Sequence, residues 1–117
     1  MNEEQLIKLC QFTKDTIVTQ PFKDKKYGDL YVIRHKSNNK WFALIFTMED
    51  RLCVNLKCYP DLAAILRDEE PAVTFGWHMN KKHWIKVDVN NISVEGLERL
   101  IKISFELTAK KKKVKNK

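Results

Sequence analysis

A chain of 117 residues is long enough for one domain with a single core and too short for several. Its 44% hydrophobic and 32% charged residues are typical of a globular protein and exclude a largely disordered one. The formal net charge is +7, but six lysines lie in the last eight residues. Without these six lysines the chain carries 16 basic and 15 acidic residues. The excess charge therefore belongs to the C-terminal segment, which attracts any polyanion without specificity.

The cysteines and the apolar runs indicate the cellular compartment in which we expect the protein. Cys10, Cys53 and Cys58 form an odd set in a chain that begins with the polar sequence MNEEQ and shows no signal-peptide pattern. We expect reduced thiols and a cytoplasmic protein. No apolar run reaches the roughly 18 residues that span a bilayer, so we expect no membrane partner. We expect a monomer or a weak dimer.

The first element in the chain has helical periodicity. Leu6, Leu9, Cys10 and Thr13 share one helix face, and Asn2 is suited to cap the helix N-terminus. These features predict a helix from about residue 3 to residue 14.

Strand patterns dominate residues 27–59. Three β-rich runs are separated by the turn-forming clusters SNN (37–39) and MED (48–50), which predicts a three-stranded antiparallel meander. In the third run, alternate residues divide into a buried face and a wetter face. The buried set is Leu52, Val54, Leu56 and Cys58, and the wetter set is Cys53, Asn55 and Lys57.

Two helices and a strand complete the chain. Pro60 begins a helix of about ten residues that ends before Pro71, with one face formed by Leu62, Ile65 and Leu66. The run HWIKVDV (83–89) alternates and predicts a fourth strand. The segment from Ser93 onward predicts a helix whose buried face is Leu97, Leu100, Ile101, Ser104 and Thr108.

The predicted order is α-β-β-β-α-β-α, an α+β fold with helices on one face of a four-stranded antiparallel sheet. Antiparallel sheets often leave the other face to solvent, here with Asn55, Lys57, Trp84 and Lys86. Residues 1–109 form the predicted domain, and residues 110–117 a flexible lysine-rich tail.

A set of spaced motifs resembles a known family. The motifs are KWFA (40–43), LKC (56–58), LR (66–67), HMNKKHW (78–84) and LIKISFEL (100–107). Together they resemble the MmcQ/YjbR family of small bacterial proteins over nearly the whole chain. The resemblance implies a fold like that of CyaY, the bacterial frataxin, and binding to double-stranded DNA through a double-wing element. It transfers no catalytic residue and no cofactor.

The segment GWHMNKKHW (76–84) has two interpretations. In a nucleic-acid site, Lys81 and Lys82 would contact phosphates, Asn80 a base edge or a phosphate, and Trp77 or Trp84 would stack on bases. In a structural role, the glycine would form a turn, the asparagine would cap the loop, and the methionine with one tryptophan would cover the core. Both roles can coexist.

Basic hairpins are the second candidate feature, because wings hold phosphates with lysines. Lys36 and Lys40 flank the SNN turn, and Arg51 follows MED. A further group, Lys23, Lys25 and Lys26, precedes the first predicted strand. Solvated loops also carry lysines without a specific role. No arginine pair is placed to recognise guanine, so we expect contacts mainly with the DNA phosphate backbone. The candidate DNA contacts are Lys36, Lys40, Lys57, Asn80, Lys81, Lys82, Trp84 and Lys86.

Other chemistries have little support. Four residues separate Cys53 from Cys58, rather than the two of a paired zinc-ligand motif, and the strand turns the two thiols to opposite faces. The first helix has few carboxylates that could bind iron. Cys58 with His83 could form a nucleophile and a base, but Cys58 falls on the apolar strand face. No phosphate loop or hydrolase motif is present. We expect no metal, no cofactor and no catalysis.

The alternative function is an interaction domain. In this hypothesis, the wetter sheet face around Lys57, Trp84 and Lys86 binds another protein or a small anionic ligand. DNA affinity would then come from the lysine-rich tail alone.

Overall fold

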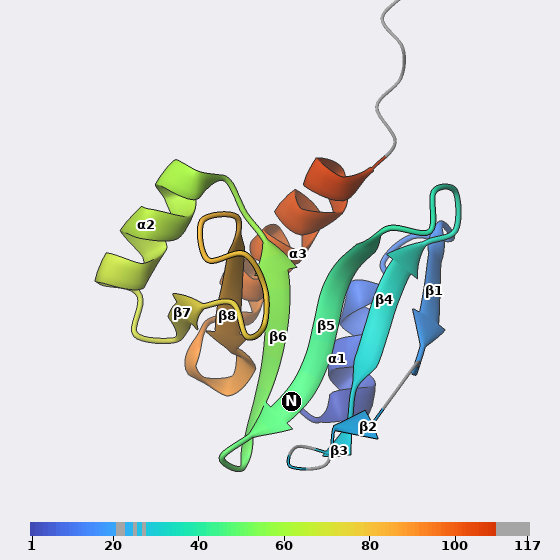
Figure 1. The fold of residues 1–117 in the computed structure, drawn as a ribbon, viewed down its shortest axis with the longest axis horizontal. Coiled ribbons are helices and arrows are strands. Elements are labelled where there is room, and N and C mark those ends of the chain that lie inside the picture. The colour runs from blue at the N-terminus through green and yellow to red at the C-terminus, as the bar shows by residue number, and fades with distance from the viewer. Residues whose placement is uncertain (21–22, 25, 27, 110–117) are drawn as a thin grey trace, which may run out of the picture.

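The computed structural model describes residues 1–20, 23–24, 26 and 28–109. Within these ranges it contains three α-helices, a six-stranded antiparallel sheet and a separate two-stranded hairpin (Figure 1). The helices are α1 (Glu3–Cys10), α2 (Pro60–Glu69) and α3 (Val94–Thr108), with a short 3-10 helix, η1 (Val89–Asn91). The strands are β1 (Thr16–Thr19), β2 (Lys23–Asp24), β3 (Gly28–Asp29), β4 (Tyr31–His35), β5 (Trp41–Met48), β6 (Arg51–Lys57), β7 (Val73–Phe75) and β8 (Trp84–Asp88).

The α+β class is confirmed, but the predicted number of strands in the sheet is wrong. The strand order is β1-β4-β5-β6-β8-β7, and β2 pairs only with β3. The four predicted strands are β4, β5, β6 and β8, while β1 and β7 are additional edge strands. With four and three residues respectively, these edge strands are too short to show a clear alternation of apolar and polar positions.

All three helices pack on the same face of the sheet, as predicted. They contribute buried residues such as Leu6, Ala63 and Ile101 to one hydrophobic cluster with the sheet. In Figure 1 the sheet is seen from its other face, with α1 and α3 behind the strands. No helix in the described ranges is long and apolar enough to cross a membrane.

The first helix is shorter than the predicted span of residues 3–14. Asn2 caps its N-terminus by accepting a hydrogen bond from the Gln5 N–H, as predicted, but the helix ends at Cys10. The chain then enters β1, where Thr16, Ile17, Val18 and Thr19 are all β-branched. Such residues favour extended backbone, and Thr13 therefore lies outside the helix.

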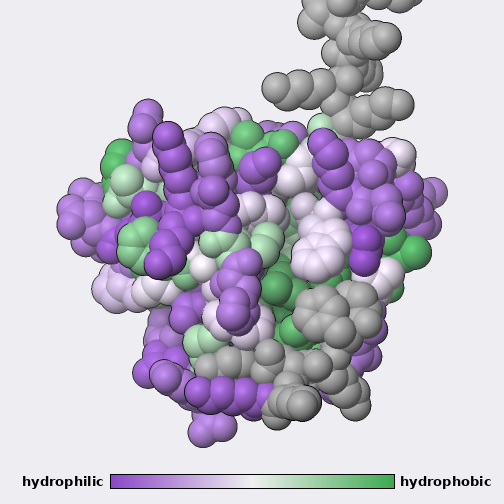
Figure 2. Space-filling model, viewed as in Figure 1, coloured by the Kyte–Doolittle hydropathy of each residue, from purple (hydrophilic) through white to green (hydrophobic). Residues whose placement is uncertain are grey.

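The sheet face turned away from the helices, here called the open face, is not wet at its centre as predicted. A second cluster of buried residues lies on it, formed by Leu30, Val32, Leu44, Phe46 and Cys53. The loop between β7 and β8 crosses this face, and Trp77 packs on Phe46 with ring centroids 4.7 Å apart. Figure 2 shows apolar surface in the middle of the open face, bordered by hydrophilic residues. Asn55, which we expected to face solvent, is fully buried.

Candidate nucleic-acid interface

The turn between β4 and β5 carries two of the predicted contact residues, Lys36 and Lys40, both exposed. Its backbone closes through hydrogen bonds from the His35 N–H to the Lys40 carbonyl and from the Asn39 N–H to the His35 carbonyl. Asn39 has a φ of 62°, a left-handed conformation that asparagine tolerates better than most residues. The predicted SNN turn is thus confirmed, with an asparagine at its strained position.

Side chains tie this turn to the rest of the fold. Asp15 accepts hydrogen bonds from both the backbone N–H and the hydroxyl of Ser37, each at 2.9 Å. The Asn38 amide donates to the carbonyl of Thr108, the last residue of α3, at 2.9 Å. The hydrogen bond from the Ser37 hydroxyl is the main cause that lowers the pKa of Asp15, which favours its ionised form. The turn is therefore anchored on Asp15, immediately before β1, and on the C-terminal end of α3.

His35 supports the same turn from inside. Its side chain is fully buried, its Nε2 lies 2.8 Å from the Thr108 Oγ1, and its ring packs on Phe105 with centroids 4.1 Å apart. Thr108 was predicted on the buried face of the last helix, but its contacts with the turn and those of Asp15 were not predicted. Asp15 is 22 positions from Ser37, and Thr108 is 70 or more positions from Asn38 and His35. No local sequence pattern indicates contacts between residues so far apart.

The second candidate segment forms the loop between β7 and β8. Asn80 accepts hydrogen bonds through its Oδ1 from the backbone N–H groups of Lys82 and His83, at 2.9 and 3.2 Å. Its carbonyl accepts from the N–H of His83 and Trp84. Asn80 therefore caps the loop, and the structural interpretation holds for this residue. Lys81 and Lys82 are exposed beside it.

Gly76 closes the loop against Trp84. Its N–H donates to the Trp84 carbonyl, and a Cβ placed on Gly76 would lie 2.8 Å from the Trp84 Cβ. Only glycine allows this approach without a backbone shift, because real Cβ contacts are never so short. The loop that presents Lys81 and Lys82 therefore needs glycine at position 76 in order to pack against Trp84.

We expect Gly76→Ala to lower the free energy of unfolding by about 2 kcal/mol, because the methyl group overlaps a rigid neighbour. Urea titration followed by tryptophan fluorescence measures this loss. Gly96→Ala is the matched control, since its methyl group would meet the Ser93 Oγ at 3.0 Å while alanine favours the helix. An equal effect of the two substitutions would contradict the role given to Gly76.

The tryptophans contribute mainly to packing. The Trp77 backbone is held by the buried Asn55, which accepts from the Trp77 N–H at 3.0 Å and donates to its carbonyl at 2.7 Å. Trp84 is half-buried at the start of β8, opposite Lys57 in the register. Trp84 therefore lies next to the predicted cations but has only part of its ring surface open for contact.

Five of the predicted contact residues meet at one end of the sheet, here called the basic end: Lys36, Lys40, Lys57, Lys81 and Lys82. Figure 1 shows the β4–β5 turn, the end of β6, the β7–β8 loop and the end of α3 on this side. Neighbouring strands are about 4.8 Å apart, so β4 and β8 are separated by roughly 15 Å. None of these five lysines takes part in an ion pair within the described ranges.

Two further lysines enlarge the basic end and were not predicted. Lys8 and Lys14 line a surface hollow of about 480 Å³ together with Lys36. Lys8 also lies 3.8 Å from Glu4, an exposed pair one helical turn apart. Because Lys36 is more than 20 positions from Lys8 and Lys14 in the sequence, no local spacing groups these three lysines.

Other predicted cations lie elsewhere. The Lys86 Nζ is 3.4 Å from the Met48 Sδ, toward the other end of the sheet. Arg51 forms a 2.7 Å ion pair with Asp88, which raises the pKa of the arginine and lowers that of Asp88. Lys25 and the tail of residues 110–117 lie outside the described residues.

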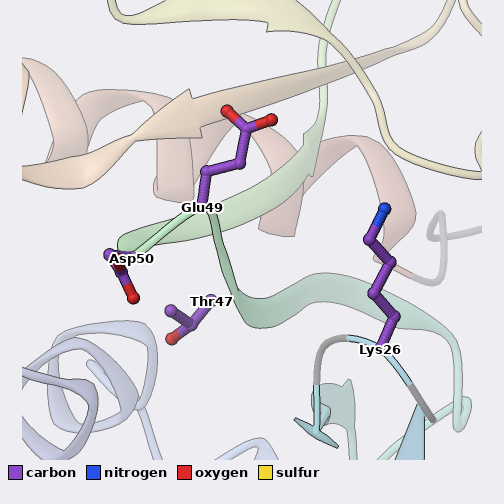
Figure 3. Close-up of a pocket in the computed structure, with 4 residues that line it drawn as sticks. All are labelled: Lys26, Thr47, Glu49 and Asp50. Atoms are coloured by element: carbon purple, nitrogen blue, oxygen red, sulfur yellow. The ribbon is translucent and has the colours of Figure 1, made fainter.

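The opposite end of the sheet has a different charge character. A pocket of about 360 Å³ there is lined by Lys26, Thr47, Glu49 and Asp50. In Figure 3, Lys26 and Glu49 extend toward the same side, whereas Asp50 points away from the lysine. Two carboxylates and one ammonium group make this pocket a poor binding site for a polyanion.

The thiols lie in the two hydrophobic clusters. Cys58 packs with the helices and Cys53 lies on the open face, so the predicted opposite orientation is confirmed. Burial raises the pKa of Cys10 to about 12 and also raises that of Cys53 and Cys58. No three His, Cys, Asp or Glu side chains gather into a metal site in the part of the chain that the structure describes.

Comparison with known proteins places the chain in a family. The YjbR family model matches residues 14–107. The Bacillus subtilis protein YyaQ, named as uncharacterized, is 36% identical over 95 residues, which cover 72% of this chain and 80% of YyaQ. The Escherichia coli protein YjbR, also named as uncharacterized, is 34% identical over 61 residues, or 52% of each chain.

Solved structures agree with this assignment. A crystal structure of a Pseudomonas syringae protein has a TM-score of 0.79 and 34% identity, and the match covers 93% of this chain and all of the other. A Deinococcus radiodurans protein has a TM-score of 0.78 and 29% identity, with 92% of this chain and 78% of the other covered. The chain described here belongs to the YjbR family.

Proposed function

We propose that the protein is a non-catalytic module that binds double-stranded DNA, chiefly through phosphate contacts at the basic end. One observation carries the proposal. Three segments far apart in the sequence bring five lysines, none of them in an ion pair within the described ranges, to one end of the sheet. The lysine-rich residues 110–117 follow α3, whose last residue lies at the same end. Clustered lysines neutralise phosphates and release counterions, which drives association.

The shape of the basic end supports contact with a duplex. The β4–β5 turn is an anchored hairpin tip with Lys36 and Lys40. The β7–β8 loop presents Lys81 and Lys82 at the same end of the sheet, on the other side of β5 and β6. We propose these two loops as the pair of wings. A lysine is a compact charge that suits phosphates rather than bidentate base recognition, so we expect weak sequence preference. That the sheet and its helices are arranged as in CyaY remains a prediction.

The absence of catalysis is part of the proposal and is supported by the thiols. The Cys58 side chain is 1% exposed within the core, and burial raises its pKa. A nucleophilic cysteine needs a lowered pKa and access to substrate. The backbone of Cys58 donates to the His83 carbonyl, but this contact does not bring the thiol to the imidazole.

The alternative ligand site is on the open face. Lys86, Thr74 and Cys53 line a pocket of about 180 Å³, which would suit a small anionic group. Asp88 and Glu49 line the same pocket and oppose an anion. We therefore favour the basic end.

Chemical-shift mapping with a short duplex distinguishes these sites. We expect the largest amide shifts in residues 36–40, 57 and 80–83, with little change near residues 49–51 and in the 180 Å³ pocket. Shifts centred on Thr74 and Lys86, with the β4–β5 turn unchanged, would support the alternative site and contradict the proposal.

A further inference from the structure

A groove lies between α2 and α3, away from the basic end's loops. Half-buried aliphatic side chains form its floor, and the hollow has a volume of about 240 Å³. Leu62 and Leu66 of α2 face Ile92 and Ile103 across it, and all four also pack against the core beneath. The groove is thus an apolar depression in a well-packed region of the molecule.

Two exposed aliphatic side chains belong to the helices that form this groove, Ile65 to α2 and Val94 to α3. Ile65 is 53% exposed and Val94 is 51% exposed. The predicted face of Leu62, Ile65 and Leu66 is only partly covered: Leu62 and Leu66 are half-buried, whereas Ile65 points largely to solvent. Since α2 covers the edge of the sheet beside β7 (Figure 1), its outer side has nothing to pack against among the residues that the structure describes. Ile65 lies three residues after Leu62, on a neighbouring part of the same helix surface.

Opposite charges also lie along the groove. Glu70 follows α2, and Arg99 is on α3, and both line the hollow. Neither side chain takes part in an ion pair in the described part of the chain. The Glu70 Oε1 accepts a hydrogen bond of only 3.4 Å, from the Ala72 N–H.

We infer that this surface binds a second copy of the chain in a two-fold symmetric dimer. The surface carries both a protruding isoleucine and an apolar groove, and both a carboxylate and a guanidinium group. A two-fold axis lets each copy place its Ile65 in the other copy's groove and its Glu70 beside the other copy's Arg99. Such self-complementarity is what a symmetric interface requires, because the same patch serves on both subunits. We expect a weak dimer whose population depends on concentration, since one groove and one side chain from each copy form its apolar part.

Sedimentation velocity of the full chain from micromolar to millimolar concentration tests the dimer. We expect a rising dimer fraction for the native sequence, and at least a tenfold weaker association for Ile65→Glu, since a charge would enter the groove. Ile17→Glu is the control, because Ile17 is a 42% exposed isoleucine on β1, at the far edge of the sheet. A native chain that stays monomeric, or equal effects of the two variants, would overturn the inference.

Mixed charge variants test the symmetry itself. Arg99→Glu and Glu70→Lys should each weaken self-association, because each homodimer would then face like charges twice. An equimolar mixture should recover dimers, since a heterodimer has two correctly paired contacts. Contacts within one chain cannot produce this recovery. Absence of recovery, with both variants folded by circular dichroism, would contradict the two-fold arrangement.

Discussion

Replacing Asn55 by alanine should lower the free energy of unfolding by about 3 kcal/mol, a large fraction of a small domain's stability. Asn55 is fully buried, and its amide pairs with both the N–H and the carbonyl of Trp77. Alanine would leave both backbone groups without a partner on a face that the protein covers. Because these bonds hold the start of the β7–β8 loop, the Trp77 contact with Phe46 should also loosen.

Urea unfolding measures the stability loss, and tryptophan fluorescence of the folded variant reports the loop. Asn91→Ala is the control, because Asn91 is exposed and donates one hydrogen bond, to Asp88, so we expect a change below about 1 kcal/mol. If Asn55→Ala were as stable as this control, the amide would not be what fixes the loop on the open face.

Replacing Lys36, Lys40, Lys81 and Lys82 together by glutamine should weaken duplex binding by on the order of 100-fold at low salt. All four side chains are exposed, so their removal leaves the core intact. Each phosphate contact contributes roughly one to the slope of log affinity against log salt. The slope should therefore become shallower by about four in the full chain.

The matched control removes the same charge from other surfaces by changing Lys26, Arg51, Lys86 and Lys102 to glutamine. Fluorescence anisotropy of a labelled duplex compares the two variants over a range of salt concentrations. Equal losses would show that net charge alone, rather than the arrangement at the basic end, governs binding.

The sequence predicted the elements with strong periodicity and missed what depends on distant contacts. The buried face of α3 is Leu97, Leu100, Ile101, Ser104 and Thr108, as the spacing indicated, because a long amphipathic helix repeats its pattern several times. The edge strands β1 and β7 were missed, since three or four residues carry too little pattern. Helix α2 was placed correctly, but the outward position of Ile65 depends on where the sheet ends.

The covering of the open face shows the same limit. Strand alternation placed Asn55 on the face opposite the helices, which is correct, but could not show that the β7–β8 loop folds over it. A buried asparagine with two backbone partners looks in the sequence like any polar residue on a wet face. The loop lysines could be proposed as phosphate contacts from the sequence, because a lysine side chain carries a positive charge wherever it lies. Their assembly at one end required the strand order, which no local pattern contains.

The most direct test of the proposed function is the duplex affinity of residues 1–109 as a function of salt concentration, beside that of the full chain. Removing residues 110–117 takes away six lysines. If the basic end binds phosphates, the shortened chain should still bind at low salt, and its affinity should fall with a log-log slope of about four. Loss of binding together with the lysine-rich residues would contradict a DNA-binding role for the folded domain.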